Sequence, residues 1–195
     1  GEISPEDPFS EAELRVGDKE SGRGFSMEFW GESPNLYGIT IQSPTGERLE
    51  VSTALKYGTQ ELSFVFVETK VQVNYVPIER NSGNTLVFFR FLHPAPGIWK
   101  LEIQGRMNSP VRFHIWLPVQ GMISEETYFL EPAPEYTVTS PGDASDGMTV
   151  TAYRQKDGSL YTKASRGYTA SQHVKPDFAA PGVEVKTAAA GRTGG

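Results

Sequence analysis

Cysteine is absent from the 195 residues of this chain. Its absence excludes disulfides, thiolate catalysis and cysteine-ligated metal sites, and it leaves the redox compartment undecided. Long apolar runs are absent too, since none approaches the roughly 20 residues that a membrane-spanning helix needs. The opening stretch GEISPEDPFSEAEL has neither a basic nor an apolar segment, so no signal peptide is visible. We therefore expect no membrane span.

Clustered positive charge is also missing. The net charge is −6, and the 18 Lys and Arg residues are scattered, which excludes a nucleic-acid-binding surface. The acidic residues Glu6, Asp7, Glu11 and Glu13 could in principle bind calcium, but no Asp-x-Asp-x-Asp-Gly loop accompanies them. We interpret them as a solvated charged surface, and we expect neither a metal site nor a cofactor.

Short stretches of alternating apolar and polar residues fill the chain from about residue 12 to residue 118. In the segment 24–31, for example, Phe25, Met27 and Phe29 alternate with polar neighbours, which is typical of a half-buried strand. Turn residues such as those at 43–46 separate the stretches. The alternation predicts a core of Phe25, Met27, Phe29, Ile39, Ile41, Phe64, Phe66, Val71, Val73, Val87, Phe89, Trp99, Leu101, Ile103, Val111, Phe113 and Ile115.

The strand pattern predicts the fold class. About seven or eight short strands without an intervening helical period indicate an antiparallel β-sandwich or jelly roll. Near residue 119 the composition shifts, and Pro-containing breaks indicate a connection that leaves the sandwich. We expect a mainly β protein with a sandwich over residues 1–135. Residues 136–195 include one short strand at 148–153 but too few apolar positions for a core, so they look like part of a larger domain.

Three motifs follow in order along that second part. They are Val150-Thr151-Ala152, then Ala164-Ser165-Arg166-Gly167, then Lys175-Pro176-Asp177-Phe178-Ala179-Ala180-Pro181-Gly182-Val183. The set resembles the subtilisin-like serine proteases (subtilases, peptidase family S8), in the α/β catalytic domain between the oxyanion asparagine and the nucleophilic serine. Thr151 departs from the usual glycine, and Ala164 stands where serine is common. A sandwich placed before this part is similar to the Csp-type subtilases of clostridia, in which a jelly roll interrupts the protease fold.

The resemblance implies a hydrolase that cleaves peptide bonds with Asp, His and Ser, in that chain order. All three would lie outside this chain, so no catalytic residue is assigned here and the chain alone should be inactive. The local histidines His93, His114 and His173 are far apart in sequence and have no triad spacing. We interpret His114 as an ordinary surface residue of a strand and His93 as a residue at a strand end.

Two groups of site residues come from the resemblance. Ser140, Pro141 and Gly142 match a Pro-Gly loop that helps to wall the substrate pocket in the family. A structural role in shaping the backbone before the nucleophile is assigned to Lys175, Pro176, Asp177, Ala180, Pro181 and Gly182.

The expected partners are the remainder of the catalytic domain and a protein or peptide substrate. Open strand edges at 148–153 and 183–186 could also pair with a second copy. The sequence itself leaves the localisation unknown, and the resemblance to the Csp-type subtilases implies a bacterial protein that is extracellular or associated with the spore or cell envelope.

Two alternatives stay open. The sandwich could be a non-catalytic binding module for a glycan or a protein, because Trp30 and Trp116 fall on the strand faces opposite the core. The same side chains, with Leu86, Phe88 and Leu92, could instead pack on a neighbouring protease domain. The parent could also be a pseudoprotease whose catalytic residues have been lost.

Overall fold

The computed structural model describes residues 1–53, 58–106, 109–119, 121–169, 173–189 and 192–194. The chain forms two compact units, Gly1–Glu131 and Pro132–Gly195, and each is treated by itself. The described residues are mainly β, as the sequence predicts, with one four-residue helix, α1 (Glu20–Arg23). The predicted domain boundary after residue 135 stays a prediction.

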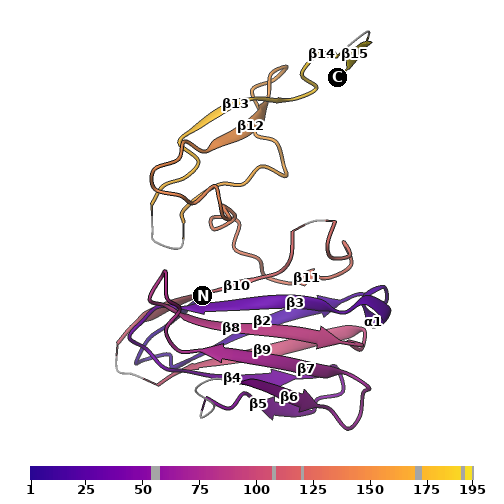
Figure 1. The fold of residues 1–195 in the computed structure, drawn as a ribbon, viewed down its shortest axis with the longest axis vertical. Coiled ribbons are helices and arrows are strands. Elements are labelled where there is room, and N and C mark those ends of the chain that lie inside the picture. The colour runs from indigo at the N-terminus through magenta and orange to yellow at the C-terminus, as the bar shows by residue number, and fades with distance from the viewer. Residues whose placement is uncertain (54–57, 107–108, 120, 170–172, 190–191, 195) are drawn as a thin grey trace. The chain divides into compact units, whose positions relative to one another are not determined.

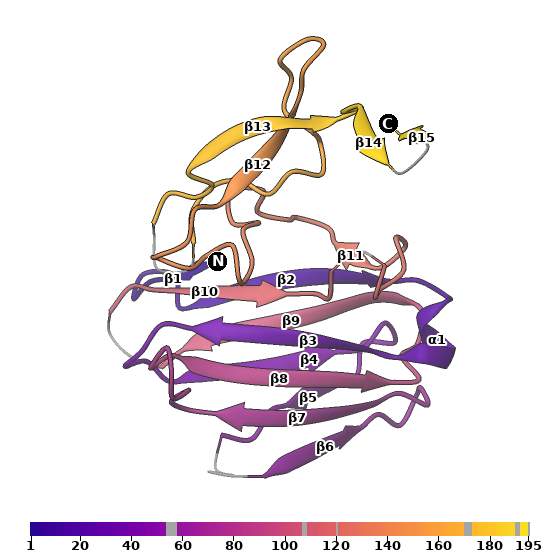
Figure 2. The same ribbon diagram turned by 45° about the horizontal axis from the view of Figure 1, so that its top comes forward.

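The first unit is a sandwich of two antiparallel sheets (Figures 1 and 2). Its described strands are β1 (Glu2–Ile3), β2 (Phe9–Val16), β3 (Phe25–Gly31), β4 (Tyr37–Gln42), β5 (Arg48–Glu50), β6 (Thr59–Ser63), β7 (Lys70–Val76), β8 (Thr85–Leu92), β9 (Gly97–Gly105), β10 (Val111–Trp116) and β11 (Tyr128–Phe129). Within the described residues, one sheet has the order β1-β10-β3-β8-β7-β6 and the other β11-β2-β9-β4-β5. The chain therefore crosses repeatedly from one sheet to the other.

Alternate side chains of each central strand point into the space between the sheets. In β3 the buried residues are Phe25, Met27 and Phe29, and Phe29 lies opposite Val87 of β8 in the register. This arrangement follows from the period of two along a strand, which sends successive side chains to opposite faces. The apolar half of each alternating segment thus forms one core.

The predicted core is confirmed at fifteen of its seventeen positions, which are all buried. Ile115 is only partly buried, although it packs against the core. Phe66 is wrong: its side chain is 73% exposed. The strand expected there ends at Ser63, because the amides of Val65 and Phe66 donate to the carboxylate of Glu47 instead of to a neighbouring strand. The short strands β1 and β11, and the longer β2, were not predicted.

Aromatic rings fill the centre of the core. Trp99 is fully buried and meets Phe64 and Phe91 edge-on, with ring centroids 5.2 and 5.4 Å apart. Its indole N–H donates to the carbonyl oxygen of Ala95 at 2.9 Å. The largest side chain of the core is therefore fixed by packing and also has its polar atom satisfied, as a buried Trp requires.

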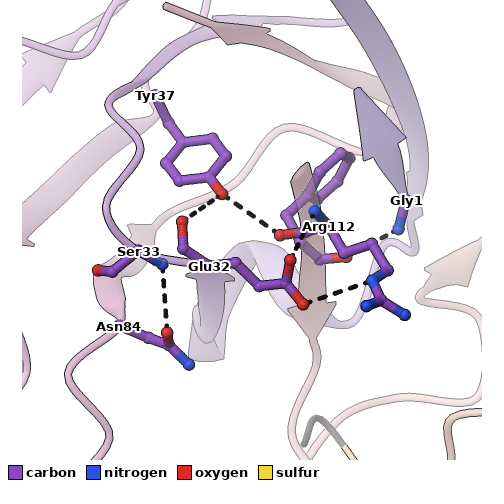
Figure 3. A network of polar contacts seen from close by, with 7 residues as sticks. Gly1, Glu32, Ser33, Tyr37, Asn84 and Arg112 are labelled. Atoms are coloured by element: carbon purple, nitrogen blue, oxygen red, sulfur yellow. Dashed lines mark hydrogen bonds and ion pairs between the residues drawn. The ribbon is translucent and has the colours of Figure 1, made fainter. Parts of the chain in front are cut away.

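A polar network closes one end of the sandwich (Figure 3). The Tyr37 hydroxyl donates to the carbonyl oxygens of Glu32 and Arg112, at 2.9 and 3.3 Å. The Glu32 carboxylate accepts from the Arg112 amide and forms an ion pair with its guanidinium. Burial, and then the charge of Glu32, raise the pKa of the Tyr37 hydroxyl. The hydroxyl is therefore a stable neutral donor that joins the chain after β3 to the start of β10.

The acidic residues near the N-terminus include two with a protein partner. Lys100 of β9 lies 2.8 Å from Glu11 and 2.9 Å from Glu13, both on the neighbouring strand β2. These hydrogen bonds raise the pKa of Lys100 above its ordinary value. The carboxylates of Glu11 and Glu13 thus serve as cross-strand ion pairs.

The second unit has less regular structure. Its described strands are β12 (Val150–Arg154) and β13 (Phe178–Val183), which pair in parallel, and β14 (Thr187–Ala189) and β15 (Arg192–Gly194), which pair antiparallel. The predicted strand at 148–153 thus begins two residues later, and Met148 is exposed. Among the residues whose burial is described, Val138 is the one buried hydrophobic side chain of this unit. In neither unit does the described chain include a helix long and apolar enough to cross a membrane.

Truncation of two phenylalanines provides a matched test of the core. We expect Phe29→Ala to lower the free energy of unfolding by about 3–5 kcal/mol, because it empties a fully buried site. Phe66→Ala should change it by less than about 0.5 kcal/mol, because that ring is exposed. Urea unfolding followed by tryptophan fluorescence measures both, since Trp30, Trp99 and Trp116 all lie in the first unit. Equal losses would contradict the assigned end of β6.

Candidate functional site in the second unit

The first and third motifs lie side by side in the parallel pair. Val150 is opposite Phe178, Ala152 is opposite Ala180, and Tyr153 is opposite Pro181. Parallel strands cannot be joined by a tight turn, so the chain between them must cross over. The second motif lies in that crossover. The residues just before β13 then lie beside the start of β12.

The second motif fixes a point where two backbone segments cross. The amide of Tyr168 donates to the carbonyl of Glu135 at 2.7 Å, and the amide of Arg166 donates to the Thr137 hydroxyl at 2.9 Å. Gly167 lies between them with a φ of 103°. A Cβ on Gly167 would fall on the Glu135 carbonyl oxygen. Glycine is therefore required here for both its backbone conformation and its small size.

Lys175 and Asp177 bind the residues just before β12. The Lys175 side chain is 7% exposed, and its ammonium donates to the carbonyl of Gly147 at 2.7 Å and to Asp177 Oδ2 at 2.8 Å. The same carboxylate oxygen accepts from the Thr149 amide at 2.7 Å, while the Asp177 amide donates to the Thr149 carbonyl at 2.8 Å. The hydrogen bond from Lys175, followed by that from Thr149, lowers the pKa of Asp177. Pro176, between them, follows a cis peptide bond.

The predicted pocket residues form a tight turn. The amide of Gly142 donates to the carbonyl of Thr139 at 2.8 Å, and Ser140 precedes Pro141 through a cis peptide bond. Ser140 and Pro141 are exposed. The Thr149 hydroxyl donates to the carbonyl of Gly142 at 2.6 Å. Thr149 thus joins the two groups of predicted site residues, which are far apart in sequence.

The end of the third motif contains a β-bulge. Pro181 is opposite Tyr153 and Val183 is opposite Arg154, so Gly182 is the extra residue with no partner across the pair. A Cβ on Gly182 would lie 2.6 Å from the Cβ of Ala152. The bulge and the close approach together explain a glycine at this position.

The histidines do not assemble into a site. His93 and His114 belong to the first unit and His173 to the second. His93 is exposed, and its φ is 47°. His114 is half-buried and stacks on Trp116, with ring centroids 6.3 Å apart, and burial lowers its pKa. It is therefore less exposed than an ordinary surface histidine.

Acid–base or metal chemistry has little support in the described parts of the chain. Among those residues no group of three His, Cys, Asp or Glu side chains could hold a metal ion. Within the described residues of the second unit, the backbone turns are accompanied by one ion pair, Lys175–Asp177.

Sequence reasoning missed Thr149 and Gly147. Thr149 contacts Gly142 and Asp177, at separations of 7 and 28 residues, and Gly147 accepts from Lys175. No motif spacing marks either residue. Thr149 falls within the strand predicted at 148–153, so the sequence pattern indicates an ordinary strand residue and not a residue that links two segments.

Exposed apolar side chains are numerous in the second unit. Those with more than a third of their surface exposed are Met148, Val150, Leu160, Tyr161, Tyr168, Val174, Phe178 and Val185.

The chain matches no protein-family model and no curated protein. It does match a solved structure described as the Clostridium perfringens CspB protease, with a TM-score of 0.79 and 23% sequence identity. The match covers 96% of this chain and 38% of that chain. The two proteins share a fold. Because the match leaves out so little of this chain, it includes most of both units. This chain spans well under two thirds of the length of the protease chain that it matches.

A second pair of variants tests the bulge. We expect Gly182→Ala to destabilise the β12–β13 pair by about 1–3 kcal/mol, because the added methyl group overlaps Ala152. Gly147→Ala is the matched control, since its Cβ would meet the nearest atom at an ordinary 3.7 Å. Amide hydrogen exchange of β12 measures both. Unchanged exchange in Gly182→Ala would contradict the close approach.

Proposed function

We propose that this chain is a segment of a subtilisin-like serine endopeptidase of the Csp type. The first unit would be the inserted jelly roll, and the second unit the part of the catalytic domain that precedes the nucleophile. The observation that carries the proposal is the match of both units together to one protease structure. A sandwich alone is shared by many unrelated proteins, and here the match includes the second unit as well.

The exposed apolar residues of the second unit support the same proposal. Parallel strands in α/β proteins are normally covered on both faces by other elements of the domain. Here Val150 of β12 and Phe178 of β13 are 47% and 50% exposed. The remainder of the catalytic domain would cover them. Pairing of two copies through the open strand edges is the competing assembly, and it would satisfy the backbone groups at the edges instead of covering these faces.

In the complete enzyme, hydrolysis would use the serine, histidine and aspartate of the family, which the other parts of the polypeptide would supply. The exposed turn Ser140-Pro141-Gly142 would contact a protein or peptide substrate beside the bond to be cut. The segment from Lys175 to Gly182 would set the backbone that leads to the nucleophile. The sandwich would brace this domain, and the enzyme would act outside the bacterial cell or at the spore or cell envelope.

Labelling with a fluorophosphonate probe tests the proposal. We expect no labelling of the 195-residue chain, and labelling of a longer polypeptide that carries this segment, at one serine downstream of Val183. Replacing that serine with alanine is the control and should abolish the signal. If the longer protein folds but is not labelled, the endopeptidase is ruled out in favour of a pseudoprotease. Labelling of the 195-residue chain would contradict the assignment of its catalytic residues.

A binding module is the second candidate, and an aromatic surface on the outer face of the first unit favours it. Trp30 and Trp116 are half-buried there, on neighbouring strands. The indole of Trp30 donates to Glu28 Oε2 at 2.8 Å, and Trp116 lies opposite Glu28 in the register. Fixed aromatic rings beside a carboxylate suit a sugar, whose apolar face stacks on rings while its hydroxyls donate to the carboxylate.

The double variant Trp30→Ala/Trp116→Ala separates the two functions. If the face packs on a protease domain, the longer polypeptide should lose about 3 kcal/mol or more of stability and bind a hydrophobic dye. If the face binds a glycan, oligosaccharide retention in affinity electrophoresis should disappear while the thermal transition stays in place. Trp30→Phe/Trp116→Phe, which keeps a ring at each site, is the control in both measurements.

A further inference from the structure

Thr149 is a junction between two segments that the proposed function treats separately. Its hydroxyl holds the carbonyl of Gly142, which ends the exposed turn. Its amide and carbonyl both bond to Asp177, in the third motif. Thr149 therefore links the β12–β13 pair to the Ser140–Gly142 turn, so the geometry of the turn depends on the position of the pair.

The loop between Gly142 and Thr149 is held at both of its ends. Thr149 binds Gly142 at the first end, and Lys175 binds the carbonyl of Gly147 at the other. Between these points, residues 143–146 are all exposed. The loop has no apolar anchor of its own there, so the direction of the turn depends on the polar contacts at its ends.

The Lys175–Asp177 pair makes these contacts mutually dependent. Oδ2 of Asp177 accepts from both the Lys175 ammonium and the Thr149 amide, at 2.8 and 2.7 Å. Lys175 is nearly buried, and its ammonium donates to this carboxylate and to the Gly147 carbonyl. Removal of the Asp177 carboxylate leaves the nearly buried Lys175 ammonium without its partner, which is costly for a buried group. The three residues thus act as a unit, in which Thr149 takes part through its backbone amide.

We propose that Thr149, Lys175 and Asp177 are positioning residues that set the geometry of the Ser140–Gly142 turn and thereby the substrate preference of the enzyme. The link to substrate rests on the proposed function. The coupling between the two segments does not, because it follows from contacts within this chain.

The coupling is tested first in the 195-residue chain. Thr149→Val removes the hydroxyl at nearly constant volume, and Thr149→Ser keeps it. We expect the amide of Gly142, which closes the turn, to exchange with solvent about tenfold faster in Thr149→Val, and near the wild-type rate in Thr149→Ser. Amides of β9 report whether the sandwich is intact. Wild-type exchange at Gly142 in Thr149→Val would overturn the proposal.

A double-variant cycle tests the unit formed by the charges. Asp177→Asn leaves the Lys175 ammonium without its carboxylate, whereas Lys175→Met/Asp177→Asn removes both charges. We expect the single Asp177→Asn to speed exchange at Gly142 more than the double variant does. Lys175→Met completes the cycle. If the effects of Lys175→Met and Asp177→Asn simply add up in the double variant, the two residues act separately, which contradicts the proposed unit.

Activity of the longer polypeptide then tests the link to substrate. We expect Thr149→Val to raise KM for peptides about fivefold and to shift the preference for the residue before the cut, with kcat within about twofold of wild type. Thr149→Ser should restore both. A fall in kcat at constant KM would overturn the role in substrate preference. If the longer protein has no protease activity, the proposed function fails, and the exchange measurements still decide whether Thr149 couples the two segments.

Discussion

Burial of alternate side chains between two sheets is the constraint on which the first unit depends. Val87, Phe89 and Phe91 of β8 are all fully buried, and they face Trp99 and its neighbours on β9 of the opposite sheet. Because the chain crosses between the sheets several times, neither sheet can form its inner surface from one continuous segment. The core therefore forms cooperatively, and the loops and outer faces are free to differ once it is in place.

The second unit follows a different rule. One buried hydrophobic side chain, Val138, is found among its residues of described burial, so apolar burial cannot hold it together. Hydrogen bonds hold it at two crossings, one between Tyr168 and Glu135 and the other between Asp177 and Thr149. Net contributions of single hydrogen bonds are small, about 0.5–1.5 kcal/mol each. A unit of this kind gains most of its stability when its exposed apolar residues are covered.

Period-two alternation was sufficient to predict most of the sandwich, because it reports which side of a strand is buried. It failed at Phe66, where the local pattern is unbroken but Glu47, a residue 19 positions earlier, takes the backbone donors that a strand would use. The long-range hydrogen bonds of Glu47 override the local pattern there, and one sequence does not reveal them. No separate strand was assigned to β2, although Ala12, Leu14 and Val16 alternate there with charged residues.

The site divides in the same way. The segment from Lys175 to Gly182 was recognisable as an ordered motif, whereas Thr149 was not, because its partners are set by the crossing of two segments. The structure also explains why two positions of the motifs are glycines. At Gly167 and Gly182 a Cβ would collide with another part of the backbone or with Ala152. These residues satisfy the packing of the fold, so the motif indicates an architecture and by itself shows no activity.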